Sequence, residues 1–383
     1  MQGKHTIEDI ARLAGVSKAT VSRVLNHKPD VDPATRERIL RIVEEVGFVP
    51  SINATNLAGG RSRLLGVLIP SFTWPFIADV MRGVAEVVAE TSYELVLYSV
   101  SEAQRERDSG GSDVIDRILS TKLVAGLLAI FPGSLSTYMV RLHKQGFPAV
   151  LIDDQTPPTS TPWVGADNYH GAQLATRHLV QLGHRRIAHI QGPGKLLCSQ
   201  ERYQGYHDVL VESSIAVDPT LVVESEFSAK GGRIAASKLF ALPTHERPTA
   251  IFAASDQIAY GVMAAAEEHG LSIPKDVALV GFDDISSAAH VRPPLTTIHQ
   301  PFAEMGQHGI ELLLSMLHTS HAHAVQHGRS TWMATTPLSA ASRDAGNGEP
   351  IRIQLPTTLI VRASCGSPTA SPDIIVPGSG ILL

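Results

Sequence analysis

The sequence has few of the features that stabilise secreted or membrane proteins. Among 383 residues there are two cysteines, Cys198 and Cys365, which are too few for a disulfide framework and lack the CxxC spacing of many metal and redox sites. No apolar run approaches the roughly 20 residues that cross a bilayer. The N-terminal residues also lack the apolar segment of a signal peptide. We therefore expect neither secretion nor membrane insertion, and a cytoplasmic location.

Charged and aromatic residues are also scarce, at 18% and 5%, and the formal net charge is −5. This balance excludes a disordered chain and a wholly basic nucleic-acid coat. The 43% of apolar residues can form a large core, and the length predicts at least two folded units. Residues 1–63 hold ten Lys/Arg against seven Asp/Glu, a net charge of +3, which leaves −8 for the remainder. A polyanion would therefore bind the N-terminal head and be repelled by the body.

The first 50 residues have apolar positions at helical spacing. A first helix begins after Thr6, which has a carboxylate three residues later as a capping partner, and ends at Gly15. Ser17 can cap a second helix, and Asp32 precedes a third that ends at Gly47. A helix, a three-residue turn containing glycine and a second helix are typical of helix-turn-helix proteins, whose second helix enters the DNA major groove.

The surface of the predicted second helix distinguishes a DNA-binding helix-turn-helix from an ordinary α-hairpin. Its buried face is formed by Val21, Val24 and Leu25, while Lys18 and Arg23 point outward among small polar residues. Cations and hydroxyl groups on one exposed face can contact bases and phosphates. This pattern favours the DNA reader.

The strings TIEDIARLAGVSKATVSRVLN and VDPATRERILRIVEEVGFVPSINATNLAGG resemble the headpiece of the LacI/GalR family of bacterial transcription repressors. The resemblance implies that Lys18, Ala19 and Arg23 reach base edges. It also implies that hydroxyl and amide side chains hold the DNA backbone. The other DNA contacts expected in the head are Thr6, which also caps the first helix, and Ser17, Thr20, Ser22 and Asn26.

Residues 51–58, SINATNLA, could form only two helical turns, too few for a helix that persists alone in water. In the resembled family this hinge segment folds on the operator, packs against its twin from a second subunit, and inserts a leucine into the minor groove. The resemblance gives that role to Leu57 and adds Asn53 and Ala54 as DNA contacts. From the residues alone, a plain linker is favoured. We assign residues 1–50 to the headpiece and 51–63 to the hinge helix and linker.

The remainder alternates between apolar, β-rich runs and helical stretches. The expected strands are 64–69, 94–100, 124–130, 148–152, 186–191, 249–254 and 276–282. The expected helices lie near 76–91, 112–121, 134–145, 169–182, 200–212, 229–240 and 256–269. Such alternation predicts parallel sheets covered on both faces and, at this length, two doubly wound lobes. The fold class is therefore multidomain, with an all-α helix-turn-helix headpiece and an α/β two-lobed domain at 64–365.

The body extends the resemblance through VGADNYHGAQLATRHLVQLGHRRIAHIQGP and RPTAIFAASDQIAYGVMAAAEEHGL, to roughly residue 318 and again at 352–363. It implies a periplasmic-binding-protein-like effector domain, and ligands of such folds lie beyond the carboxyl ends of strands. An aspartate there can instead cap a helix, and Phe227 can belong to the core. The resemblance implies effector contacts at Phe76, Asp153, Arg202, Phe227, Asp256 and Gln300.

Two segments depart from the family, an insertion at about 319–350 and a tail at 366–383. We expect the tail to be disordered. The tail lacks the leucine heptads of a tetramerisation bundle, so a homodimer is expected. A histidine group at 318–327 has no cysteine or carboxylate nearby and predicts no metal site. QGPGKLL lacks the residues of a phosphate loop. We expect no metal and no cofactor.

The leading hypothesis is a transcriptional repressor that binds a palindromic operator, responds to a small-molecule effector and has no enzymatic activity. A sugar is the first candidate effector, because carbohydrates prevail in the resembled family. A nucleobase or nucleoside is the alternative. A cytosolic solute-binding protein without a regulatory role would share the body but not the head. An α/β enzyme would need a catalytic motif such as G-x-G-x-x-G or G-x-S-x-G, and neither is found.

Overall fold

The chain divides into two compact units between Ser62 and Arg63, here called the head and the body. In this computed structural model, the described residues are 5–25, 28–48, 62–99, 118, 123–131, 135–153, 160–324, 350–366 and 374–376. Asn26, Asn53, Ala54 and Leu57 lie outside these residues, as do nearly all of the helix expected at 112–121 and most of the expected insertion. No helix in the described ranges is long and apolar enough to span a membrane.

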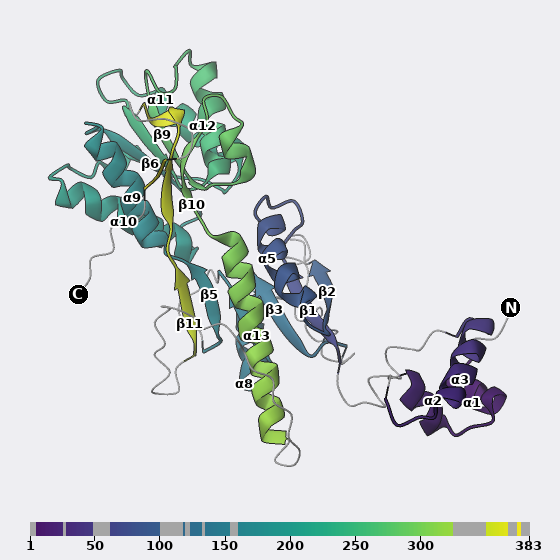
Figure 1. Ribbon diagram of the computed structural model, residues 1–383. Helices are drawn as coiled ribbons and strands as arrows, with labels where there is room; N and C mark the ends of the chain where they lie inside the picture. The colour runs from purple at the N-terminus through teal and green to yellow at the C-terminus, as the bar shows by residue number, and fades with distance from the viewer. Residues whose placement is uncertain are drawn as a thin grey trace. The chain divides into compact units, whose positions relative to one another are not determined.

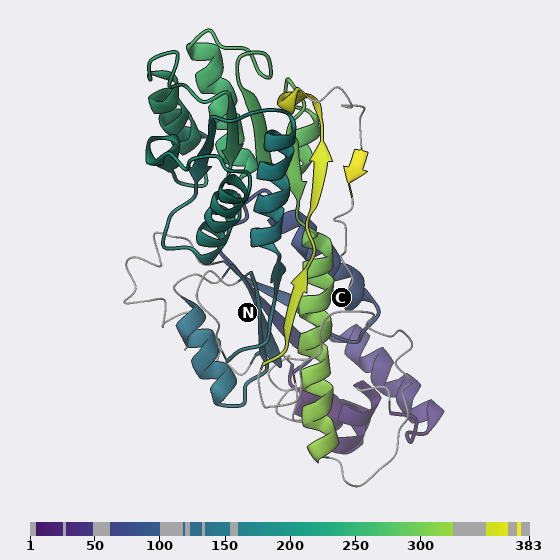
Figure 2. The same ribbon diagram turned by 90° about the vertical axis from the view of Figure 1, so that its left-hand side faces the viewer.

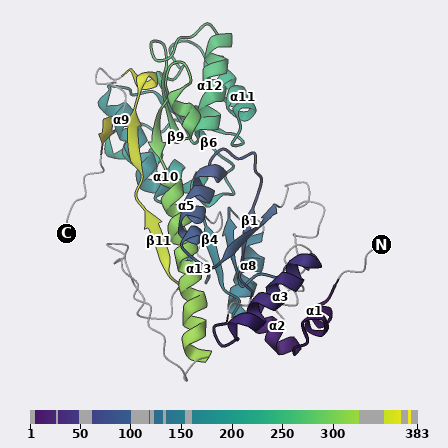
Figure 3. The same cartoon turned by 45° about the vertical axis from the view of Figure 1, so that its right-hand side comes forward.

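The head consists of α1 (Ile7–Ala14), α2 (Lys18–Leu25) and α3 (Pro33–Glu45), which pack together in Figure 3. Thr6 caps α1 as expected, because its hydroxyl oxygen accepts from the Asp9 N–H at 3.3 Å and its own N–H donates to the Asp9 carboxylate at 2.9 Å. Gly15 ends α1 with φ at +63°, a conformation that favours glycine. The core of the head includes Ile10 and Ile39, both fully buried.

The first lobe of the body, lobe 1, contains an all-parallel six-stranded sheet. Its order is β2 (Glu94–Ser99), β1 (Leu64–Ile69), β3 (Gly126–Ile130), β4 (Ala149–Ile152), β5 (Trp163–Ala166) and β11 (Arg352–Leu355). Side chains alternate between the two faces of the sheet. Leu65 and Val67 pack in the core of α5 (Ile77–Ala89) and α13 (Phe302–Ala324), whereas Leu64 and Leu68 pack in that of α8 (Ser136–Lys144). Both faces are therefore covered (Figure 1).

Lobe 2 contains the seven-stranded sheet. Its order is β7 (Val222–Glu224), β6 (Ile187–Gln191), β8 (Ala250–Ala253), β9 (Ala278–Asp283), β10 (Thr296–His299), β12 (Thr358–Val361) and β13 (Ile374–Val376). Ile251 faces the core formed with α11 (Ala229–Phe240) and α12 (Asp256–Glu268), and Phe252 faces the core formed with α9 (Asn168–Gln181) and α10 (Leu197–Glu212). Short 3₁₀ turns lie at Pro219–Leu221, Ser286–Ala289 and Ala363–Cys365.

Three crossovers join the lobes. β5 leads into α9, β10 leads into α13, and β11 leads into β12. In Figure 2 the last crossover is seen as consecutive yellow strands beside the long green helix α13. Each crossover follows the carboxyl end of a strand, so these strand ends of both lobes meet where the chain crosses. This is the position at which open α/β sheets bind ligands.

The two-lobed fold is confirmed, and the expected parallel pairing holds in lobe 1 and in most of lobe 2, where two pairs of strands are antiparallel. There β12 runs antiparallel to β10 and β13 runs antiparallel to β12. The carboxyl ends of the two sheets face each other. A strand that continues straight from β11 into lobe 2 therefore runs antiparallel to the strands beside it. The other two crossovers cause no antiparallel pairing, because there the chain enters the other lobe as a helix, α9 or α13, and not as a strand.

Several elements were missed in the sequence. The strands β5, β7 and β10–β13 have only three or four residues each, too short for a clear alternation. Helix α13 was not among the expected helices, and it continues to Ala324, inside the expected insertion. Ile374–Val376, in the tail expected to be disordered, pair with β12. The edge of β12 offers unpaired backbone groups to this apolar, β-branched segment.

Candidate DNA-binding face and effector site

The second helix of the head presents the expected polar face. Val21 and Val24 are fully buried, while Lys18, Ala19 and Arg23 are exposed. Ser17 lies just before α2, and its hydroxyl oxygen accepts from the Thr20 N–H at 3.1 Å. Ser17, Thr20 and the partly buried Ser22 flank the cations on the same short segment. The geometry thus leaves the side chains expected to read bases at the surface.

Both cations of this face have acidic neighbours within the head. Lys18 Nζ lies 2.8 Å from Glu8 Oε1, and Arg23 Nη1 lies 3.2 Å from Asp30 Oδ2. The side chains of Lys18 and Arg23 are about 60% exposed in these pairs. Water screens such pairs strongly, so they cost little to exchange for DNA phosphates or base edges.

In lobe 2, Arg202 of α10 is the centre of a buried polar network. Its Nε donates to Asn168 Oδ1 at 2.9 Å and its Nη1 donates to the carbonyl oxygen of Ala254 at 2.5 Å. The guanidinium also lies 3.8 Å from the centroid of the Phe282 ring and 5.9 Å from that of Phe227. Only 3% of Arg202 is exposed, so these contacts fix the direction of its charge.

Asp283, at the end of β9, joins Arg202 to Gln300. Its Oδ1 lies 3.7 Å from Arg202 Nη1 and accepts from Gln300 Nε2 at 2.7 Å. The backbone φ of Asp283 is +116°, which turns the chain at the end of the strand. Burial raises the pKa of Asp283 to about 6, although Arg202 opposes this rise. Sequence reasoning did not assign Asp283 to the effector site.

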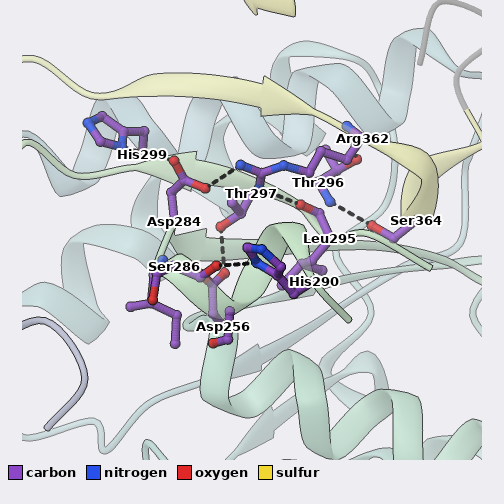
Figure 4. Close-up of polar contacts among 12 residues, drawn as sticks. Asp256, Asp284, Ser286, His290, Leu295, Thr296, Thr297, His299, Arg362 and Ser364 are labelled. Carbon is purple, nitrogen blue, oxygen red and sulfur yellow. Dashed lines mark hydrogen bonds and ion pairs between the residues drawn. The ribbon is translucent and has the colours of Figure 1, made fainter. Parts of the chain in front are cut away.

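Asp256, an expected effector contact, lies within electrostatic range of Asp283 in this network. Its side chain is fully buried. Its Oδ1 accepts from the Thr297 hydroxyl at 2.6 Å and its Oδ2 accepts from the Ile285 N–H at 2.9 Å (Figure 4). Burial, and then the charge of Asp283, raise the pKa of Asp256 well above its usual value. Asp256 therefore holds the chain that follows β9.

Asp284 fixes the other side of the same chain segment. Its carboxylate accepts from Arg362 Nη2 at 2.8 Å, and His299 Nδ1 lies 3.0 Å from its second oxygen. Arg362 Nη1 also donates to the carbonyl oxygen of Leu295 at 2.9 Å. Figure 4 shows these groups converging from β9, β10 and the end of β12. The strand ends that carry Asp283 and Gln300 are thereby held together.

Lobe 1 contributes Asp153 and Phe76. Asp153 follows β4 with φ at +50° and is 3% exposed. Phe76 precedes α5, and its ring centroid lies 4.5 Å from that of Phe131 and 4.9 Å from that of Phe302. An aromatic surface thus lies at the strand ends of lobe 1, as expected for a site that covers apolar faces of a ligand.

Charged groups of both lobes act on the buried thiol of Cys198. Burial raises the pKa of this thiol to about 12, Arg202 lowers it, and the carboxylates of Asp153, Asp283 and Glu201 raise it further. Asp153 belongs to lobe 1, whereas Cys198, Glu201 and Arg202 belong to α10 of lobe 2. Asp153 of lobe 1 and Arg202 of lobe 2 therefore both lie within electrostatic range of the Cys198 thiol.

Asn168 and Glu201 were missed as members of this network. Asn168 is 2% exposed, and its Nδ2 donates to Glu201 Oε2 at 3.1 Å while its Oδ1 accepts from Arg202. The available signal was the Asp167-Asn168 pair between a short apolar run and a helix. The Asp167-Asn168 pair was not assigned to the site because β5 was not recognised as a strand that ends there.

A helix-turn-helix head and a body whose two lobes share one buried polar site define a ligand-controlled DNA-binding protein. Residues 6–51 match bacterial regulatory proteins of the lacI family, and residues 176–365 match a periplasmic binding protein-like domain. The ribose operon repressor of Haemophilus influenzae is 36% identical over 315 residues, which cover 82% of this chain and 92% of that relative. The chain belongs to the lacI family of bacterial regulatory proteins.

Solved structures are similar over nearly the whole chain. The Lac repressor dimer bound to operator and the anti-inducer ONPF is 27% identical, has a TM-score of 0.76 and is matched over 95% of this chain and 99% of that one. The complex of the transcriptional regulator CelR with cellobiose is 30% identical, with a TM-score of 0.63 and matches over 94% and 99%. The protein is a ligand-responsive transcriptional repressor with a DNA-binding helix-turn-helix, and not an enzyme.

Proposed function

We propose that the protein represses transcription as a homodimer on a palindromic operator and that a sugar bound between the lobes controls its DNA affinity. The observation that carries this proposal is the buried Arg202–Asp283–Gln300 network at the meeting point of the strand ends. A guanidinium and a carboxylate held in fixed directions suit the bidentate binding of neighbouring hydroxyl groups. A nucleobase or nucleoside is the alternative effector.

On DNA, Lys18, Ala19 and Arg23 contact base edges, and the hydroxyl groups around them contact the backbone. Thr6 has a further structural role, because its hydroxyl group caps α1. A helix that enters the major groove reads bases with the exposed side chains near its N-terminus. The proposed backbone contacts are Thr6, Ser17, Thr20, Ser22 and Asn26. In the hinge, Asn53, Ala54 and Leu57 contact the minor groove.

In the effector site, Arg202, Asp283 and Gln300 of lobe 2 act with Asp153 and Phe76 of lobe 1. Phe227 adds an aromatic surface near Arg202. Asp283 joins Asp256 as a proposed contact, since each oxygen of Asp256 accepts one hydrogen bond within lobe 2 and keeps a second acceptor site. A ligand that contacts both lobes stabilises one arrangement of the lobes over another.

The ligand changes operator affinity only by its differential affinity for the two arrangements, typically 1–3 kcal/mol, or roughly 5–150-fold. The relatives whose names or descriptions include ribose and cellobiose support a sugar as the first choice. Operator binding by the Lac repressor dimer supports the same assembly for this chain.

The test begins with selection of bound sequences from random DNA by the full-length protein. Operator affinity is then measured by fluorescence anisotropy with and without each member of a panel of sugars and nucleosides. A palindromic selected sequence, salt-sensitive binding and a response to a sugar are expected. A response to nucleosides alone would replace the sugar with the alternative effector. Operator binding that no compound alters would contradict the proposed control.

Leu57 provides a separate test of the hinge. Leu57→Ala should weaken operator binding and reduce DNA bending, because an apolar wedge in the minor groove is lost. The melting temperature of the body should stay unchanged. Unaltered affinity and bending would make residues 51–58 a plain linker.

A further inference from the structure

The effector site has more acidic groups than basic ones. Asp153, Glu201 and Asp283 all act on the Cys198 thiol, and Arg202 is the basic group that acts on it. The exposed Lys195, in the loop before α10, is not among these groups. The charged groups that act on this buried thiol are thus three carboxylates and one guanidinium.

Arg202 has already committed much of its hydrogen-bonding capacity. Nε is directed to Asn168, Nη1 is directed to the Ala254 carbonyl oxygen, and the guanidinium plane rests on Phe282 at 3.8 Å. A phosphate dianion requires several convergent donors to replace its water. The contacts with lobe 2 limit what Arg202 can offer such a group.

Among the residues that the structure describes, Gln300 and Ser199 each have a buried polar atom near Arg202 without a hydrogen-bond partner. Gln300 is 2% exposed, and because its Nε2 donates to Asp283, its Oε1 is left as an acceptor. Ser199, 1% exposed, has an unpartnered hydroxyl group beside Gly192 and the Phe227 ring. A buried acceptor requires a donor from a ligand or water. Sugar hydroxyl groups donate, whereas the oxygens of a phosphate dianion or a carboxylate do not.

We infer that the effector site selects uncharged, polyhydroxylated compounds and rejects their phosphorylated or carboxylated derivatives. This inference rests on the proposed function and narrows its effector class. The acidic groups repel an anion, the unpartnered Gln300 oxygen requires a donor, and Arg202 alone does not reverse this balance. The cell's unmodified sugar or nucleoside, and not its phosphate ester, would therefore control the repressor.

The experiment uses isothermal titration calorimetry on the full-length protein at pH 7.5. The ligands are matched pairs: ribose with ribose 5-phosphate, glucose with glucose 6-phosphate, and adenosine with adenosine 5′-monophosphate. For the pair whose neutral member binds, we expect the phosphate ester to bind at least about 100-fold more weakly, because a charged group enters an acidic, poorly solvated site.

One substitution, Glu201→Gln, tests whether negative charge at the site causes this selectivity. Glu201→Gln removes one negative charge and retains an oxygen for Asn168, so the affinity ratio of neutral to phosphorylated ligand should fall about tenfold. Glu212→Gln is the matched control on the same helix, because Glu212 forms an exposed ion pair with Arg177. It should leave the ratio unchanged.

The outcomes separate this inference from the proposed function. A phosphate ester that binds as tightly as its neutral partner, or more tightly, would overturn the inference and leave an effector-controlled repressor. An unchanged ratio in Glu201→Gln would overturn the electrostatic cause. If no member of any pair bound, both the inference and the proposed sugar or nucleoside effector would be overturned.

Discussion

The head and the body use arginine in opposite ways. Arg23 of the head is 61% exposed and has one acidic neighbour, Asp30. Arg202 of the body is 4% exposed at its side chain and contacts an amide, a carbonyl oxygen, a carboxylate and an aromatic ring. The first guanidinium can exchange its partner at little cost, whereas the second is held in one direction before any ligand arrives.

This difference matches two kinds of recognition. A DNA reader must let its cations move between water, phosphates and base edges, and its affinity then depends on salt. A small-molecule site must hold its polar groups in place, because each group that loses a partner within the protein leaves a buried charge or dipole. The predictions below test whether the two regions behave in these separate ways.

The largest effect is expected from Arg202→Ala. It leaves Asp283 and the Asn168 carbonyl oxygen without their buried partner, so the free energy of unfolding of the body should fall by about 3–5 kcal/mol. The effector response should be lost while operator binding is retained. Urea unfolding followed by tryptophan fluorescence reports on the body, since all three tryptophans lie beyond residue 63.

Arg233→Ala is the control for this variant, because Arg233 forms an exposed ion pair with Glu268 and should cost little. Equal destabilisation by the two substitutions would remove the distinction between buried and exposed arginines. Wild-type effector affinity in Arg202→Ala would remove Arg202 from the site.

Ile10→Ala should disable the head and spare the body. Ile10 is fully buried in the small core of the head, and such truncations cost about 2–5 kcal/mol. Because small units have little stability to lose, operator binding should fall at least roughly 100-fold. Effector binding, measured by calorimetry, should remain at the wild-type value. A parallel loss of effector binding would mean that the two units do not fold independently.

Arg23→Ala should weaken binding to the preferred operator by about 1–3 kcal/mol and relax base choice at one position in each half-site. Stability should change little because Arg23 is exposed. Competition binding against single-base operator variants provides the measurement. Arg41→Ala, which removes an exposed cation paired with Glu37 on α3, is the matched control. Uniform weakening on every sequence would identify Arg23 as a phosphate contact.

The smallest effect concerns pH. Because the pKa of Asp283 is raised to about 6 in the folded protein, folding favours its protonated form. Its contribution to stability is full below its usual pKa of 3.8 and is lost as pH rises through about 6. Relative to Asp283→Asn, the wild-type body should therefore lose on the order of 1–2 kcal/mol between pH 4 and pH 7. Urea unfolding curves that shift in parallel with pH for both proteins would contradict this.

The head could be predicted almost completely from local sequence. Thr6, Gly15 and Ser17 act within a few residues of their own positions, and the expected caps and turn are observed. In the body, the strands that lie within apolar runs of five or more residues were recognised, whereas β5, β7 and β10–β13 were not. A strand-ending aspartate such as Asp256 looks the same in sequence whether it faces a ligand or the chain behind it.

The sequence by itself determined the helix-turn-helix, the two doubly wound lobes and the ends of the strands at which a site forms. Periodicity and capping are local properties, so they can be read without the fold. Only the tertiary structure decided which residues meet at the site. Asn168, Arg202, Asp283 and Gln300 are far apart in the chain, and their contacts depend on strand order, on the crossovers and on the positive φ angle of Asp283. The antiparallel β12 also followed from the way the facing sheets are joined, which no local pattern encodes.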